Sequence, residues 1–122
     1  MTESPVVVIG AGPQGLAAAA HLLQRGLEPL VVEAGDGPGA AIAEWGHVRT
    51  FSPWPELVDE AAARLLAPTG WIRPTSGYPS GGEWVENYLV PLSNLLGEHV
   101  RYRQRDRSVA SGTRPSTDSG PA

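Results

Sequence analysis

Three glycines near the start of the chain have the spacing of a phosphate-binding turn. Gly10, Gly12 and Gly15 form the pattern GxGxxG, and four β-branched residues, 6–9, precede them. Gly10 permits a tight turn after a strand, Gly12 lets the backbone approach a pyrophosphate, and Gly15 lets the next helix pack close to that strand. The free N–H groups at the start of this helix would then face the phosphates.

One carboxylate could bind the ribose of the same ligand. Glu33 follows a second apolar run and lies close to the offset of about 20 residues at which an acid binds ribose hydroxyls. A carboxylate repels a 2′-phosphate, so Glu33 favours FAD or NAD and disfavours NADP. The predicted cofactor-binding residues of this unit are Gly10, Ala11, Gly12, Pro13, Gln14, Gly15, Glu33 and Ala34.

These residues require a strand, a helix and a second strand. Residues 6–9 predict the first strand, and a helix is expected from Pro13 to Gln24 or Arg25, ended by Gly26. The second strand ends at Glu33. The sequence therefore predicts an α/β fold with a Rossmann-like parallel sheet built on a βαβ dinucleotide-binding unit.

Composition limits the chemistry that the chain can perform. The 122 residues fit one domain, and 15 glycines and 12 prolines predict long irregular connections. The absence of cysteine excludes disulfides and a redox dithiol within this chain, and the absence of lysine excludes a Walker-type phosphate loop. We expect no metal site. A net charge of −4 predicts neither nucleic acid nor a membrane as partner.

The source and location are also expectations from the sequence. A lysine-free composition rich in alanine, glycine, proline and arginine is typical of GC-rich codons, which suggests a bacterial source. The segment before the first strand is too short for a signal peptide, and it carries Glu3 in place of a positive charge. We therefore expect a cytoplasmic protein.

The stretch from Gly35 to Pro55 shows no clean periodicity and contains several aromatic residues. A loop of about 20 residues is uncommon in a compact domain unless it is functional. Trp45 either covers a ligand or packs against a helix, and both readings stay open. For Phe51 and Trp54 we expect ordinary packing.

Residues 6–33, the Gly37-Pro38-Gly39 run and Trp45 resemble the amino-terminal part of FAD-dependent oxidoreductases, nearest to flavin-containing monooxygenases and thioredoxin-reductase-like flavoproteins. The resemblance implies that the glycines hold the FAD pyrophosphate, that Glu33 holds the adenosine ribose, and that Trp45 lies along the cofactor. Trp45 comes later than the Gly-Gly-x-Trp of that family. The cofactor implied is FAD, with NAD as an alternative at the same site.

Two further helices and a third strand complete the expected elements. Apolar spacing predicts a helix over 55–66, and a second helix from Gly82 or Glu83 to Leu96 with a kink near Asn87, caused by Pro91. A short parallel strand is expected over 99–103. Alternating arginines at 101, 103, 105 and 107 indicate a solvated edge.

The expected domain boundaries are a partial FAD/NAD(P)-binding Rossmann domain over 1–105 and a disordered tail over 106–122. Relative to the resembled family, we expect the FAD-binding domain to be incomplete, and truncation or frameshift of a longer gene is a hypothesis. A homo-oligomer or a missing C-terminal part could cover the open edge of the sheet.

Two function classes follow from the sequence. The first is the FAD-binding portion of an oxidoreductase, and the second is a non-catalytic remnant or a small module that binds the ADP moiety. No catalytic residue is identified. His47 and Arg49 are the best polar candidates, although a structural role is favoured for both, and His21 is expected to be structural.

Overall fold

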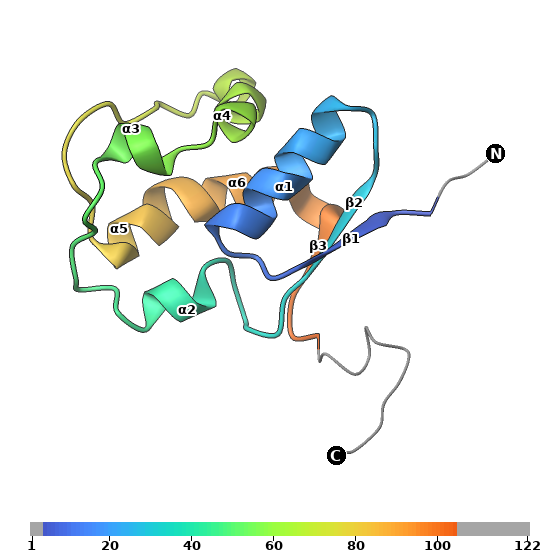
Figure 1. Cartoon of the computed structure of the whole chain (residues 1–122), viewed down its shortest axis with the longest axis horizontal. Coiled ribbons are helices and arrows are strands. Elements are labelled where there is room, and N and C mark those ends of the chain that lie inside the picture. The colour runs from blue at the N-terminus through green and yellow to red at the C-terminus, as the bar shows by residue number, and fades with distance from the viewer. Residues whose placement is uncertain (1–3, 105–122) are drawn as a thin grey trace, which may run out of the picture.

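The computed structural model describes residues 4–104 of the chain. Figure 1 shows three strands side by side, with the helices gathered to one side of them. Strands β1 (Val6–Ile9), β2 (Pro29–Val32) and β3 (Val100–Arg101) are parallel and lie in the order β1-β2-β3. This arrangement confirms the predicted α/β class. The tail predicted over 106–122 lies outside the described residues.

Six α-helices occur in the described part of the chain: α1 (Pro13–Gln24), α2 (Ala40–Ala43), α3 (Trp54–Leu57), α4 (Glu60–Leu66), α5 (Gly81–Trp84) and α6 (Val90–Leu96). Short 3₁₀ turns cover Ala67–Thr69 and Gly97–His99, and a π-helical segment covers Val85–Leu89. None of these helices is long and apolar enough to cross a bilayer.

The first strand, first helix and second strand form as the sequence predicts. Helix α1 begins at Pro13, whose missing N–H would have no helical acceptor, and Gly26 follows the helix with φ 77°. One face of the sheet packs on the helices. Val8 pairs with Val31, Val31 pairs with Val100, and all three side chains belong to or contact the buried core.

The opposite face of β1 is largely uncovered. Val7 and Ile9 alternate with the core-facing Val8, and they are 49% and 61% exposed. Strand β1 is also an edge, since β2 is its only partner among the described strands. Parallel sheets normally have both faces covered. Strand β1 instead exposes apolar surface on one face and unpaired backbone groups along its edge.

The helix predicted over 55–66 is wrong as one element, because the structure divides it into α3 and α4. Val58 adopts an extended backbone (φ −103°, ψ 121°) and buries its side chain in the core. Asp59 then starts α4 as its N-cap, because its carboxylate accepts a hydrogen bond from the N–H of Ala62 at 3.0 Å. Asp59 therefore caps the start of a new helix, and it does not lie inside one longer helix as the apolar spacing predicts.

The irregularity predicted near Asn87 is present as the π-helical segment between α5 and α6. Pro91 lacks the N–H that would bind the carbonyl of Asn87 one turn earlier. The indole Nε1–H of Trp71 donates to that carbonyl at 2.8 Å instead. A side chain from a distant loop thus satisfies the acceptor that the proline leaves free.

The segment from Gly35 to Pro55 is more ordered than we predicted, because it contains α2 and the first residues of α3. Trp54 is 8% exposed, which confirms ordinary packing for this residue. The same prediction is wrong for Phe51, whose side chain is fully exposed. The apolar character of the two side chains does not distinguish them in the sequence. In the structure Trp54 begins helix α3, whereas Phe51 lies in the preceding loop.

Candidate functional site

The glycine turn lies where β1 ends and α1 begins. Gly10 has φ 98°, a conformation that favours glycine, and its N–H donates to the carbonyl of Val32 at 2.8 Å. A Cβ on Gly15 would lie 1.9 Å from the carbonyl oxygen of Gly10, so no larger residue fits between helix and turn. These two glycines are required by the fold itself.

Gly12 differs from its neighbours because nothing in the protein requires it to be glycine. Its φ is −85°, and a Cβ there would meet no atom within 4 Å. The residue forms the N-cap of the twelve-residue helix α1 and has no side chain to cap it. Open space beside a helix start whose N–H groups lack intrahelical acceptors fits a bound phosphate.

The carboxylate of Glu33 reaches back to the glycine turn. One oxygen accepts a hydrogen bond from the N–H of Ala11 at 2.6 Å, and the other accepts one from the N–H of Gly35 at 2.7 Å. The side chain is half-buried. The structure therefore brings Glu33 to the glycines, as a ribose-binding acid requires, while Ala34 beside it is exposed.

Two further segments complete this corner, through contacts that the sequence analysis did not predict. The carbonyl of Ala11 accepts a hydrogen bond from Gly39 at 2.9 Å, and the carbonyl of Gly35 accepts one from Arg103 at 3.0 Å. Arg103 has φ 62°, which is unusual for a residue other than glycine, and its Nε lies 2.9 Å from a carboxylate oxygen of Asp36. The closely spaced glycines at 35, 37 and 39 were the available sequence signal.

Tyr102 lies near the same corner. Its hydroxyl forms a hydrogen bond with Ser93, and burial raises the pKa of the phenol above its usual value. The negative charge of Glu33 acts in the same direction, while the hydrogen bond from Ser93 opposes it. The phenol therefore stays neutral at physiological pH and presents no negative charge beside Glu33.

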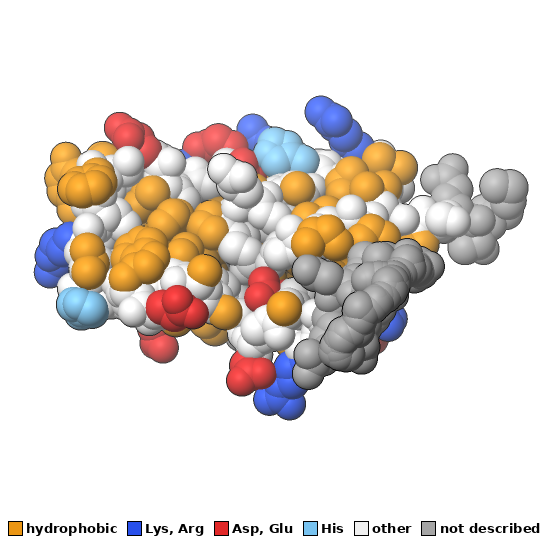
Figure 2. All heavy atoms as spheres, turned by 60° about the horizontal axis from the view of Figure 1, so that its bottom comes forward, with side chains coloured by type: hydrophobic (Ala, Val, Ile, Leu, Met, Phe, Trp, Pro, Cys, Tyr) orange, Lys and Arg blue, Asp and Glu red, His pale blue; other side chains and the backbone are white. Residues whose placement is uncertain are grey.

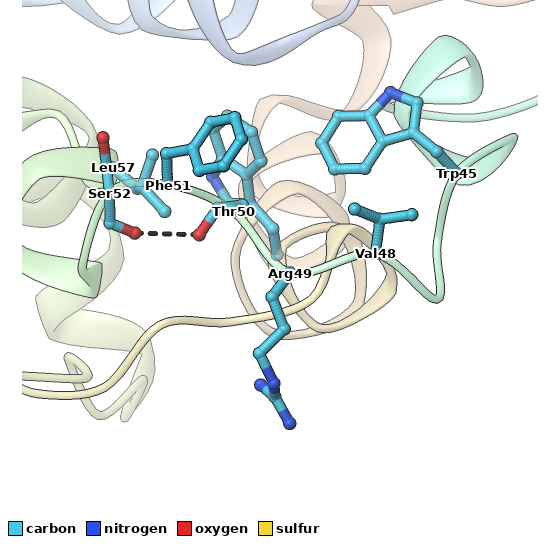
Figure 3. Close-up of a pocket in the computed structure, with 8 residues that line it drawn as sticks. Trp45, Val48, Arg49, Thr50, Phe51, Ser52 and Leu57 are labelled. Atoms are coloured by element: carbon cyan, nitrogen blue, oxygen red, sulfur yellow. Dashed lines mark hydrogen bonds between the residues drawn. The ribbon is translucent and has the colours of Figure 1, made fainter.

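Trp45 lines an apolar pocket of about 430 Å³, and none of residues 10–15 belongs to the lining of this pocket. Figure 3 shows Trp45 and Val48 on one side of this pocket and Phe51 with Leu57 on the other. The side chain of Trp45 is 36% exposed. Figure 2 shows hydrophobic side chains gathered at this end of the molecule, around the region that carries α2 and α3.

The two polar candidates of this loop do not form a catalytic arrangement. Figure 3 shows the side chain of Arg49 pointing away from the apolar lining, and its guanidinium donates to the carbonyl of Tyr78 at 2.7 Å and contacts Glu83 at 3.4 Å. His47 is exposed. These contacts agree with the structural role favoured for Arg49.

His21 also has a structural contact. His21 Nε2 lies 3.0 Å from a carboxylate oxygen of Asp59, which links α1 to α4 and supports a structural role. Within residues 4–104 no group of three or more His, Asp or Glu side chains could hold a metal ion.

A parallel βαβ unit with an open glycine turn and an acid after its second strand defines a dinucleotide-binding protein of the Rossmann-like class. A family model described as "FAD dependent oxidoreductase" matches residues 5–112 of the chain. The chain therefore belongs to the FAD-dependent oxidoreductase family.

Two curated relatives resemble part of the chain. It is 48% identical over 67 residues to phytoene dehydrogenase of Streptomyces griseus, a match that covers 49% of this chain and 13% of that enzyme. It is 39% identical over 67 residues to thiamine thiazole synthase of Saccharolobus islandicus, covering 52% of this chain and 25% of that enzyme. The chain thus spans a quarter or less of these relatives.

Solved structures match more of the chain. The bacillithiol disulfide reductase of Bacillus cereus matches with a TM-score of 0.63 and 27% identity, over 84% of this chain and 29% of that one. The protein OTEMO, in a complex with FAD and NADP, matches with a TM-score of 0.56 and 25% identity, over 84% of this chain and 20% of that one. A steroid monooxygenase bound to NADP shares the fold, with a TM-score of 0.61 and 23% identity over 84% of this chain and 20% of that one.

Proposed function

We propose that the chain forms the FAD-binding part of a flavin-dependent, NAD(P)H-linked oxidoreductase or monooxygenase, and that it binds the ADP moiety of FAD. The observation that carries this proposal is the open space at Gly12, where the fold itself imposes no need for glycine. Backbone N–H groups at the start of α1 would hold the pyrophosphate, with Gly10 and Gly15 shaping the turn. FAD supplies the redox chemistry when bound, and this region supplies position and charge.

The identity of the dinucleotide depends on Glu33. Its carboxylate would accept hydrogen bonds from ribose hydroxyls and would repel a 2′-phosphate. We therefore propose FAD, with NAD as the alternative at this site and NADP disfavoured. The proposed binding set is Gly10, Ala11, Gly12, Pro13, Gln14, Gly15, Glu33 and Ala34, with Trp45 toward the flavin end.

The apolar pocket supports the part proposed for Trp45. Aromatic and aliphatic side chains make up most of its lining, the hydroxyl of Thr50 donates to the carbonyl of Ser52, and the polar head of Arg49 is turned away. Such a lining suits an uncharged ring system better than it suits phosphate or ribose. We propose that the ring end of the cofactor lies on this side of Trp45.

Calorimetric titration with ADP tests the proposal. We expect the wild-type protein to bind ADP, and Gly12→Ala to weaken binding by about tenfold or more, since a methyl group would take the space of the phosphate. The fold should tolerate the alanine because its Cβ meets no protein atom. Equal ADP affinity of the wild type and the variant would contradict the proposal.

A second candidate is a module that binds the ADP moiety without catalysis. The exposed edge and face of β1 favour it, because a complete doubly wound sheet would cover both. A yellow purified protein that absorbs near 450 nm, as oxidised flavin does, supports the first candidate, and a colourless protein that still binds ADP supports the second. We propose that a second copy of the chain or a further C-terminal part covers β1. We also propose a cytoplasmic location.

A further inference from the structure

We propose that Glu33 is a positioning residue which holds the glycine turn in its binding shape before any ligand arrives, as well as an acceptor for the ribose. The second role belongs to the proposed function above, on which this inference partly rests. The first role concerns the protein alone. It follows from the hydrogen bonds that the carboxylate makes within the chain.

The carboxylate joins two separate loops. Its first oxygen holds the N–H of Ala11, which lies between two glycines of the turn, and its second oxygen holds the N–H of Gly35, which lies after β2. Ala11 is completely buried, so water cannot replace this bond without local opening. Glycine-rich backbone has many alternative conformations, and this bond selects one of them.

A second hydrogen bond fixes the peptide group that follows Ala11. The carbonyl of Ala11 accepts a hydrogen bond from Gly39 at 2.9 Å, at the start of α2. Both polar groups of Ala11 are therefore engaged by the loop that follows β2. Consequently the N–H of Ala11 is not available to a phosphate, and Ala11 would contribute to cofactor binding through its position.

Hydrogen bonds to β3 and to the residues after it hold the backbone of Glu33 in place. The backbone N–H of Glu33 donates to the carbonyl of Arg101 at 2.9 Å, and its carbonyl accepts from Gln104 at 2.9 Å. A Cβ on Gly35 would lie 3.0 Å from a carboxylate oxygen of Glu33 and 2.6 Å from Ala40, so a larger residue would disturb the acid. Backbone and neighbours together orient the side chain toward Ala11.

Positioning and ribose binding are compatible. A carboxylate has about four lone-pair sites, and the two backbone bonds use one on each oxygen. One site on each oxygen remains for a ribose hydroxyl. Ligand binding therefore need not break the bonds to Ala11 and Gly35.

The two roles can be separated with a ligand that lacks the ribose hydroxyls. We would measure the affinities of ADP and of 2′,3′-dideoxy-ADP for the wild type, for Glu33→Gln and, as a control, for Glu56→Gln at an exposed position of helix α3. Glutamine has one acceptor oxygen and cannot hold both N–H groups. We expect Glu33→Gln to weaken dideoxy-ADP by about fivefold or more, because the turn loses its shape, and the control to leave it unchanged.

An unchanged affinity of Glu33→Gln for dideoxy-ADP, together with a weakened affinity for ADP, would overturn the inference and leave Glu33 as a ribose ligand only. If wild-type protein bound neither nucleotide, the proposed function would fail. The inference would still be decided on the free protein. There, amide hydrogen exchange should be faster at Ala11 and Gly35 in Glu33→Gln than in the wild type, and equal exchange would overturn it.

A measurement on the wild type covers the case in which Glu33→Gln does not fold. NMR scalar couplings across hydrogen bonds should link the amide nitrogens of Ala11 and Gly35 to the side-chain carboxyl carbon of Glu33, because the carboxylate accepts from both N–H groups. The amide of exposed Glu56 should show no such coupling to the Glu33 carboxyl and serves as the control. Absence of the couplings at Ala11 and Gly35 would overturn the inference.

Discussion

At the scale of single residues, the three glycines of the turn are explained by different physical requirements, although a sequence pattern treats them alike. Gly10 is favoured by its positive φ, and Gly15 is required because a Cβ would collide with the carbonyl oxygen of Gly10. Gly12 lies beside open space. The first two serve the fold, and the third is free to serve a ligand. Substitutions at these positions should therefore affect stability and binding separately.

Gly15→Ala should destabilise the protein strongly. Its Cβ would lie 1.9 Å from the carbonyl oxygen of Gly10, so α1 must move away from the turn. We expect a loss of about 1–3 kcal/mol in the free energy of unfolding, measured by urea denaturation. Gly37→Ala is the matched control, since its Cβ meets nothing within 4 Å, and it should change stability by less than about 0.5 kcal/mol. Equal effects of the two substitutions would contradict this explanation.

Tyr88 should make the protein sensitive to alkali. Burial raises the pKa of its phenol above the usual value, so the unfolded chain loses the proton at a lower pH than the folded protein does. This contribution to stability is complete below about pH 10 and falls as the pH rises toward the folded pKa. Urea denaturation between pH 8 and 11 should therefore show a decline that is smaller in Tyr88→Phe. The exposed Tyr78→Phe is the control, and an unchanged decline in Tyr88→Phe would contradict the prediction.

At the scale of elements, the sequence predicted the regular pieces well and the breaks poorly. Strand β1, helix α1 and strand β2 were predictable because hydrophobic runs, Pro13 and Gly26 agree with one another. The division between α3 and α4 was not, because the apolar spacing continues through it. Only the tertiary burial of Val58 and the capping by Asp59 decide that break.

The π-helical segment shows the same limit. Pro91 predicts an irregularity in the helix. The sequence does not show that the indole N–H of Trp71 donates to the carbonyl of Asn87 in place of a backbone N–H. The role of Glu33 as a link between two loops was hidden for a similar reason. Its partners are backbone N–H groups, which every residue except proline carries.

A double-mutant cycle tests the explanation of this segment. Trp71→Phe keeps a ring beside Tyr88 but removes the donor, and it should cost about 0.5–1.5 kcal/mol. Pro91→Ala restores an N–H that can bind the carbonyl of Asn87. We expect Pro91→Ala to be more favourable in the Trp71→Phe background than in the wild type, measured by urea denaturation. Additive effects within about 0.3 kcal/mol would show that the two groups do not share this acceptor.

At the scale of the whole molecule, the helices cover one face of the sheet and leave much of β1 exposed. Val7 and Ile9 present aliphatic surface on a strand edge that carries no charge. Such an edge is a template for pairing with another strand. We expect the isolated protein to associate through β1 as its concentration rises.

Ile9→Lys should reduce that association. A charge on the uncovered face opposes strand pairing, and Ile9 is 61% exposed, so the fold should retain its melting temperature within a few degrees. Light scattering coupled to size-exclusion chromatography over a concentration series measures the effect. Glu56→Lys introduces a positive charge at an exposed position of α3 and serves as the control. Similar association of the wild type and Ile9→Lys would exclude β1 as the interface.

The pairing of Val31 with Val100 also has a kinetic consequence. These partners lie far apart along the chain, because α4 and α6 lie between the two strands in sequence. Closing so long a segment is entropically slow, whereas β1, α1 and β2 are contiguous. Refolding should therefore begin in the first 32 residues. The backbone hydrogen bonds of Glu33 with Arg101 and Gln104 should form last, when β3 pairs with β2.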